Sequence, residues 1–488
     1  MRRILTLTFL LIPFLSFSQS VEKNVYDPGD PTNGYYLAVR PRSGSIRGTL
    51  LLLTSFTPPE ALLSETRLHN VTYANDLLTV YVSLGKKICA DTATINRINL
   101  MVKHLTTTYS ADTSRMALAG YSYAGGVALR YTELAYKNPS VCGFQPKAVF
   151  AIDAPVDLIG LWHWCEREIK KNYFPGSVAD GKILLDLMTK DIGAFPATPD
   201  TYQYLTPFNK DLVSSGNEQS LVSIPLRLYY DADIQWQLAN RRNSLYDTNI
   251  PDGSELINRL LLLGNARAEF VSAKMPGVRS NGMRNPNSLS IVDEVDCIQW
   301  IRKALGIFDP NTWVPPYQYS APAGWSIERF ALPPDFAPQI TWKGVEDVRF
   351  HPGWGDSLSE GYWSYTYLWW IDGNPVIDAA SLQQALQAYY TGLVNRNIVP
   401  GKIPADKRIP TVATIKKIKP AEKDKETYTG VIRMLDYLAQ RPMELNTIIH
   451  VRVPQSSGKT VVLVGISPQP FSHPVWKTLD KIPADFAP

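Results

Sequence analysis

Histidine and cysteine, two residue types that often bind metals, are scarce in this sequence. Six histidines and four cysteines are spread over 488 residues, and nowhere does their spacing match a metal site. Glycine-rich phosphate loops and dinucleotide-binding fingerprints are missing as well. We therefore expect no metal ion and no cofactor.

An excess of one charge is also missing. The 49 lysines and arginines against 45 aspartates and glutamates leave a net charge of only +4. The lysines between residues 416 and 425 alternate with acids, so they form no basic stripe. Binding to the phosphates of a nucleic acid needs such a stripe. The composition thus predicts no nucleic-acid partner.

The only long apolar run stands at the N-terminus. A Met-Arg-Arg start is followed by an apolar stretch over residues 4–17 and by a small residue at Ser18, which is the layout of a signal peptide. The run is shorter than the roughly 20 residues of a membrane span, and Pro13 interrupts it. We predict that residues 1–18 are removed and that the chain is exported to the periplasm or outside the cell, without a membrane span in the mature chain.

Export would permit disulfides between the four cysteines. They stand at Cys89, Cys142, Cys165 and Cys297. Four cysteines allow three complete pairings, and the sequence does not choose between them. Buried free thiols fit the same sequence equally well.

Apolar strands alternate with amphipathic helices in the first part of the chain. Strands are predicted at residues 49–55, 77–84, 116–120, 148–152, 226–230 and 268–273, and helices at 59–75, 92–109, 125–137, 234–246 and 290–305. Such alternation predicts an α/β domain with a mostly parallel sheet and helices on both of its faces. The irregular stretch at residues 156–224 is too long for a plain connection, and we interpret it as a lid-like insertion.

Ser122 has the strongest chemical signal in the chain. It stands in Gly120-Tyr-Ser-Tyr-Ala124, between an apolar strand and a helix that opens with small residues. Small residues on both sides are needed where a strand turns sharply into a helix, because larger side chains would collide there. The N–H groups that open the helix would face an oxyanion formed beside the serine. A plain helix start is the alternative interpretation.

The order of these elements resembles the α/β-hydrolase superfamily over about residues 49–306, in a first domain that we place at residues 19–306. The motif of that family is G-x-S-x-G, with Ala124 here in place of the last glycine. The resemblance implies that Ser122 is the nucleophile, that the acid after the penultimate strand is Asp233, with Asp231 as second choice, and that the oxyanion is bound by backbone N–H groups of Tyr123 and of Phe56 or Thr57. It further implies an ester, amide or peptide substrate.

The histidine of that family is missing. The loop after the last strand, where the family places it, offers Asn281, Asn285 and Asn287. An asparagine does not accept a proton near neutral pH. Asn285 or Asn287, just before the closing helix, is predicted to stand at the degenerate histidine position.

Three interpretations of this gap remain open. The fold has become a binding or scaffold protein, or a base has moved elsewhere, or the chemistry has changed. His163, in the insertion, is the candidate for a relocated base, although we favour its interpretation as an ordinary lid histidine packed between Trp162 and Trp164. We expect a weak or inactive hydrolase, with a non-catalytic binding protein as the alternative.

A second domain follows a proline-rich linker at residues 307–324. Residues 325–488 predict an α+β domain with an antiparallel sheet, with strands at 347–351, 362–371, 411–418, 427–435, 445–453 and 460–467 and a helix at 379–396. The aromatic strand at 362–371 is either an aromatic platform for a sugar or an apolar chain, or a strand buried by the helix on one face and by the first domain on the other. We favour burial, and the role of this domain stays unassigned.

Overall fold

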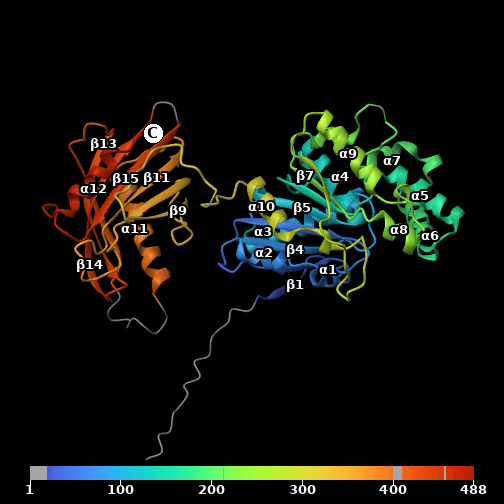
Figure 1. Ribbon diagram of the computed structural model, residues 1–488, viewed down its shortest axis with the longest axis horizontal. Helices are drawn as coiled ribbons and strands as arrows, with labels where there is room; N and C mark the ends of the chain where they lie inside the picture. The colour runs from blue at the N-terminus through green and yellow to red at the C-terminus, as the bar shows by residue number, and fades with distance from the viewer. Residues whose placement is uncertain (1–18, 213, 311, 399–408, 455–457) are drawn as a thin grey trace, which may run out of the picture. The chain divides into compact units, whose positions relative to one another are not determined.

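The computed structural model describes residues 19–488 apart from 213, 311, 399–408 and 455–457. The predicted signal peptide lies outside the described residues. The chain divides into two compact units between Ile307 and Phe308, and Figure 1 shows each with its own sheet. This division falls at the start of the segment that we interpreted as a linker.

The first unit is built on an eight-stranded sheet. Its strands, in the spatial order β1-β2-β4-β3-β5-β6-β7-β8, are β1 (Val21–Val25), β2 (Tyr35–Val39), β4 (Leu77–Ser83), β3 (Gly48–Thr54), β5 (Met116–Tyr121), β6 (Val149–Ile152), β7 (Leu226–Tyr230) and β8 (Ala268–Ser272). Strand β2 is antiparallel to both neighbours, and β3 to β8 are parallel. The predicted α/β architecture is confirmed, and two N-terminal strands extend it.

Helices cover both faces of this sheet. On one face lie α3 (Thr92–Tyr109), α4 (Tyr123–Lys137) and α9 (Ile250–Leu262), and on the other α1 (Pro59–Glu65), α2 (Leu68–Ala74) and α10 (Glu294–Ala304). Side chains alternate between faces along a strand, so Leu51 and Leu53 pack under the first group, whereas Leu50 and Leu52 pack under the second. Four consecutive leucines are thereby buried in two separate cores.

The insertion between β6 and β7 is helical. It consists mainly of α5 (Leu158–Lys171), α6 (Pro175–Asp191) and α7 (Pro199–Leu205), and Figure 1 shows these helices gathered with α8 (Ile234–Arg241) at one end of the unit. They share a small core in which Trp162, Met188 and Tyr202 are buried. The sequence had indicated an irregular stretch, because prolines and aromatic residues obscure the helical periodicity.

All four cysteines are free thiols, and all four lie in the first unit. Burial raises the pKa of Cys89, Cys165 and Cys297 to about 12 and that of Cys142 to about 11. The structure therefore selects the free thiols from the two states that the sequence left open.

The second unit is a seven-stranded sheet in which all neighbours are antiparallel. Its strands, in the order β12-β13-β14-β15-β11-β10-β9, are β12 (Val412–Ile418), β13 (Glu426–Asp436), β14 (Arg441–Arg452), β15 (Lys459–Ser467), β11 (Tyr365–Asp372), β10 (Gly344–Phe350) and β9 (Ser326–Leu332). Helices α11 (Ala379–Asn397) and α12 (Val475–Ala484) complete it. The predicted α+β pattern is confirmed; β9 and α12 were not predicted.

The aromatic strand β11 is buried on both faces. Tyr367 and Trp369 pack in the core beneath α11, and Trp370 packs on the opposite face with Tyr317 and Phe486. An open aromatic platform is thus ruled out for these side chains. Its second cover comes from the C-terminal unit itself rather than from the first domain, which corrects our expectation.

Part of the predicted linker belongs to the second core. Tyr317 and Tyr319 are buried there, and Gln318 pairs with Ala487 across an isolated bridge. The prolines prevent regular structure in this segment, but its aromatic side chains are apolar enough to pack.

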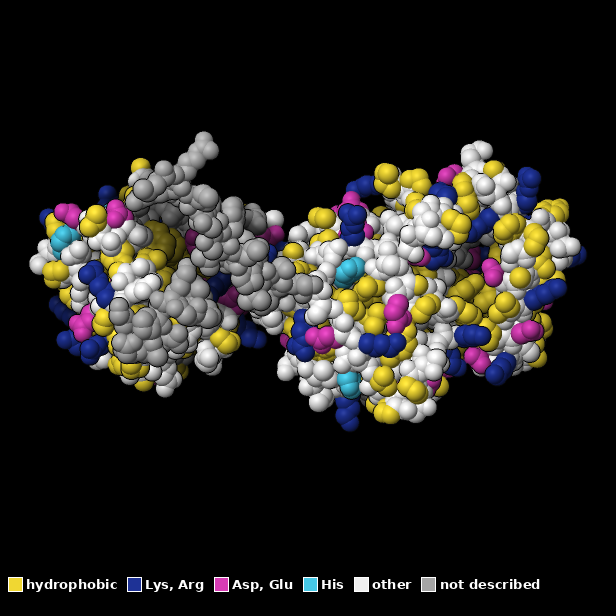
Figure 2. All heavy atoms as spheres, turned by 90° about the horizontal axis from the view of Figure 1, so that it is seen from below, with side chains coloured by type: hydrophobic (Ala, Val, Ile, Leu, Met, Phe, Trp, Pro, Cys, Tyr) yellow, Lys and Arg dark blue, Asp and Glu magenta, His cyan; other side chains and the backbone are white. Residues whose placement is uncertain are grey.

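Acidic and basic side chains are mixed over the face that Figure 2 shows, with histidines at isolated positions. Across the residues that the structure describes, no helix is both long and apolar enough to span a bilayer.

Candidate active site

Ser122 forms the turn between β5 and α4. Its backbone adopts φ 53° and ψ −127°, a sparsely populated region that costs about 1–3 kcal/mol and is held only where the surroundings enforce it. Two bonds do so, because the Ser122 N–H donates to Ile152 O at 2.8 Å and the Gly125 N–H donates to Ser122 O at 2.8 Å. The residue is only 9% exposed. It lines a cavity of about 430 Å³.

Small residues make this turn possible. A Cβ on Gly120 would collide with the backbone of Ala124, and one on Gly125 would collide with the Ala154 side chain. Ala124 itself is fully buried and fits without a glycine. The steric argument from the sequence thus explains Gly120, and the crowding at α4 falls on Gly125 rather than on Ala124.

Asn287 reaches Ser122 from the loop between β8 and α10. Its Nδ2 donates to Ser122 Oγ at 3.2 Å. Asn285 faces elsewhere, because its Oδ1 accepts from Arg241 Nη2 at 2.9 Å and from the Asn287 N–H at 3.0 Å. The structure therefore brings Asn287, and not Asn285, to the serine.

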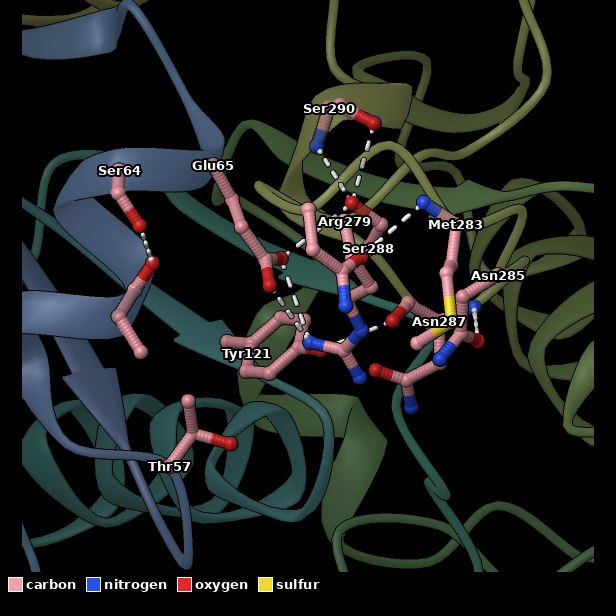
Figure 3. A network of polar contacts seen from close by, with 12 residues as sticks. Thr57, Ser64, Glu65, Tyr121, Arg279, Met283, Asn285, Asn287, Ser288 and Ser290 are labelled. Carbon is pink, nitrogen blue, oxygen red and sulfur yellow. Dashed lines mark hydrogen bonds and ion pairs between the residues drawn. The ribbon is translucent and has the colours of Figure 1, made fainter.

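A polar network holds this loop in place (Figure 3). Arg279 Nη1 lies 3.0 Å from Glu65 Oε1, and Ser288 Oγ donates to the other oxygen of Glu65 at 3.3 Å. The Tyr121 hydroxyl donates to Asn287 O at 2.9 Å. Glu65 ends α1 and Tyr121 ends β5, so both sides of the loop are tied to regular elements. Asn287 is thus fixed beside Ser122 by contacts that the sequence does not reveal.

Two carboxylates follow β7, where the acid of the site was predicted. Asp231 accepts from the Gly277 N–H at 2.8 Å and pairs with Arg284 Nη1 at 2.8 Å. Asp233 accepts from the Trp236 N–H at 3.0 Å, which caps α8, and pairs with Arg284 Nη2 at 3.2 Å. The Trp236 N–H together with Arg284 lowers the pKa of Asp233. Both carboxylates therefore anchor the loop through one arginine.

Strand order and turn geometry now decide the fold. Six parallel strands with an antiparallel second strand, a serine on a strained strand-to-helix turn after β5 and acids after β7 occur together in one fold. It is the α/β-hydrolase fold. Family models and curated proteins gave no match to the sequence.

Solved structures of hydrolases resemble the chain distantly. An esterase from Pyrobaculum calidifontis is 17% identical over 59% of this chain and 86% of its own, with a TM-score of 0.37. An S-formylglutathione hydrolase from Agrobacterium tumefaciens is 12% identical over 59% and 99%, with a TM-score of 0.37. An esterase from Rhizomucor miehei is 13% identical over 60% and 86%, with a TM-score of 0.40. Similarity this remote transfers no activity or substrate.

The predicted acid needs a correction within this hydrolase fold. A triad acid accepts a hydrogen bond from the histidine and orients it. Asp233 instead caps a helix and is 41% exposed at its side chain, whereas Asp231 is 7% exposed. Both acids pair with Arg284 of the loop after β8, but only Asp231 also accepts from a backbone N–H of that loop, at Gly277.

Of the three predicted oxyanion donors, only Tyr123 has a backbone N–H that is not already bonded to a carbonyl group. Its N–H opens α4 and so has no carbonyl one turn earlier to receive it. The Phe56 N–H donates to Gly85 O at 2.7 Å, and the Thr57 N–H donates to Ser55 O at 2.7 Å. The first bond ties the turn after β3 to the loop after β4, and the second lies within the turn. The prediction of a backbone donor from Phe56 or Thr57 is therefore wrong for this conformation.

His163 does not approach Ser122. It lies on the outer face of α5 with 56% of its side chain exposed, and its Nδ1 is 3.4 Å from Glu166 Oε2. It lines a different cavity from the one that holds Ser122. The inner face of α5 is apolar and turns Leu161 and Trp162 inward. The relocated-base prediction is thus wrong for His163, and its ring packs on Phe195 rather than between the two tryptophans.

Asp153 is a further carboxylate of the site, and its place in the sequence fits a residue of the site and a cap of the following helix equally well. It follows β6 with φ 43°, and it lines the same cavity as Ser122. Burial raises the pKa of Asp153, and the side chains of Asn249 and Asn287 oppose that rise. The signal was its place directly after a parallel strand, since such strands end at a common edge.

Proposed function

We propose that this chain is an exported protein of α/β-hydrolase fold that binds a small molecule in the Ser122 cleft and has lost efficient hydrolysis. The observation that carries the proposal is the 3.2 Å contact from Asn287 Nδ2 to Ser122 Oγ. A hydroxyl becomes a nucleophile when a neighbouring base takes its proton. An amide N–H at that place donates a hydrogen bond to the hydroxyl and takes no proton from it.

The loss is large in catalytic terms. Removing the base of a serine triad leaves oxyanion and binding contributions worth on the order of 10³ over water. The second oxyanion donor is also engaged elsewhere, as the bonds of Phe56 and Thr57 show. In any residual reaction, Ser122 Oγ would attack an ester or amide carbonyl and form an acyl-enzyme. We expect it to be far below that of an intact triad.

A fluorophosphonate probe tests this proposal, because it labels only activated serines. The purified chain is treated with the probe and read by intact mass, alongside Ser122→Ala, Asn287→His and Asn285→His. Asn285→His is the matched control, since Asn285 lies in the same loop without contacting Ser122. We expect no labelling of the wild type or of Asn285→His, and slow labelling of Asn287→His.

Labelling by Asn287→His is expected to be slow for a structural reason. Asp153 lies beside position 287, but Asp231 and Asp233 are paired with Arg284. A new histidine would therefore lack the usual orienting acid. Stoichiometric labelling of the wild type that disappears in Ser122→Ala would contradict the proposal and show an active hydrolase.

The export part of the proposal has a separate test. The full-length chain is expressed with its own N-terminus in a Gram-negative host, and the periplasmic fraction is analysed by intact mass. We expect a mass that lacks the first 18 residues, as the sequence pattern predicts. A full-length chain confined to the cytoplasm would contradict export.

A further inference from the structure

The cavity beside Ser122 receives three polar side chains from α8 and the residues that end it. Gln237 and Arg241 stand four residues apart on α8 and so share a face of the helix. Arg242 ends the helix in a left-handed conformation, φ 57°, and the Asn243 N–H then donates to Gln237 O at 3.3 Å. All three side chains, Gln237, Arg241 and Asn243, line the cavity with Ser122.

Arg241 differs from the two arginines of the neighbouring loop. Arg279 pairs with Glu65 at 3.0 Å, and Arg284 pairs with Asp231 at 2.8 Å. Arg241 donates to Asn285 Oδ1 at 2.9 Å and lies over the Trp236 ring, and within the described residues it forms no ion pair with a carboxylate. Its guanidinium therefore offers charge and N–H donors to the cavity.

Two carboxyl groups of the same cavity act on Arg241 only at longer range. They belong to Asp153 and Asp180, which line the cavity without an ion pair to Arg241 in the described chain. Burial raises the pKa of both carboxyl groups. Neither carboxyl group therefore takes the place of a carboxylate bonded directly to the Arg241 guanidinium.

Gln237 and Asn243 line the cavity, but their amide oxygens are enclosed by the protein. Gln237 and Asn243 are each 6% exposed, and within the described chain neither Gln237 Oε1 nor Asn243 Oδ1 receives a hydrogen bond. Buried acceptors are costly to leave unpaired, and native proteins contain few of them. Both oxygens lie beneath the surface of the cavity, so in this conformation they offer no acceptor to a ligand.

We propose that the Ser122 cleft binds a small carboxylic acid. Its carboxylate bonds Arg241, the arginine of the cavity that forms no ion pair within the described residues. The inference rests on the proposed function, because it names the class of ligand that the non-hydrolytic cleft holds.

Matched ligands with and without a carboxylate test the inference on the mature full chain. The probes are D-glucuronate, D-gluconate, L-malate and L-glutamate, each compared with a neutral counterpart: D-glucose, D-glucitol, malamide and glutamine α-amide. Binding is measured by titration calorimetry and by saturation-transfer NMR. We expect at least one acid to bind and its neutral counterpart to bind about 10- to 100-fold more weakly, the usual range for a charged hydrogen-bond partner.

Arg241→Gln should weaken the binding of that acid by a similar factor, about 10- to 100-fold. Arg242→Gln is the matched control, because Arg242 is adjacent and exposed, and it should leave binding unchanged. Equal binding of acids and neutral counterparts by the wild type overturns the inference, as does binding of none of the four acids. Because this comparison changes only the ligand, it decides the question even if Arg241→Gln fails to fold.

Failure of this inference and failure of the proposed function give different results. Selective binding of acids with serine labelling in the wild type would leave the ligand class standing and overturn the loss of hydrolysis. If the wild type is not labelled and does not prefer acids, the loss of hydrolysis stands and the ligand class is overturned.

Discussion

At Gly120 the turn before Ser122 leaves no space for a side chain. A Cβ there would meet the carbonyl group of Ala124, and backbone at the start of a buried helix cannot move aside cheaply. We predict that Gly120→Ala lowers the free energy of unfolding of the first unit by about 1–3 kcal/mol. Urea denaturation followed by circular dichroism measures it.

Gly29→Ala serves as the control for that substitution. A Cβ on Gly29 would lie 3.3 Å from Asp27 Oδ1, an atom of a flexible side chain. The control should change the free energy of unfolding by less than about 0.5 kcal/mol, as surface substitutions do. Equal stability of Gly120→Ala and wild type would show that the turn between β5 and α4 can shift to accommodate a Cβ.

Single residues of the site were predictable only where the pattern is local. Ser122 stands between a strand and a helix within a few residues of sequence, and the missing histidine was visible as three asparagines in one loop. Arg284 and Arg241 gave no signal, because their roles depend on how that loop packs against the ends of β7 and α8. The same long-range packing explains why Asp231 is buried and Asp233 is exposed, and why His163 points away.

Among the elements, β10 carries an unusual buried acid. Glu346 is fully buried in the aromatic core and accepts from the Tyr389 hydroxyl at 2.6 Å. Burial raises the pKa of Glu346 from 4.5 to about 7. The folded state therefore binds this proton more tightly than the unfolded state.

The sign of the pH dependence follows from that difference. Between pH 4.5 and 7 the unfolded carboxyl ionises while the folded one stays protonated, so the free energy of unfolding falls as pH rises, by at most about 3 kcal/mol. We predict that Glu346→Gln flattens this fall in denaturation experiments at several pH values. Glu360→Gln, at an exposed position, should keep the wild-type slope, and an unchanged slope in Glu346→Gln would contradict the assignment.

Elements with one clear periodicity were predicted well. The ranges of α3 and β7 agree residue for residue with the sequence pattern. The single helix expected at residues 59–75 is broken at Thr66, which adopts an extended backbone, and no glycine or proline marks that break. Strands β1 and β9 carry mostly exposed or half-buried residues, so their apolar signal is weak.

For the whole molecule, each described core cluster lies within one unit. Three clusters contain only residues up to Ile307, and the other three contain only residues from Phe308 onward. Because no described core is shared, we predict two unfolding transitions in calorimetry of the full chain. Gly120→Ala should shift one of them and Glu346→Gln the other, whereas a single transition moved by both variants would show that the units unfold as one.

Three of the four free cysteines, Cys89, Cys165 and Cys297, are buried, so their alkylation reports opening of the first unit. A thiol with a pKa near 12 is ionised to only about one part in 10⁵ at pH 7, and the thiolate is the form that reacts with alkylating reagents. Since the second unit contains no cysteine, the alkylation rate of these three thiols at neutral pH measures how often the first unit opens and does not depend on opening of the second.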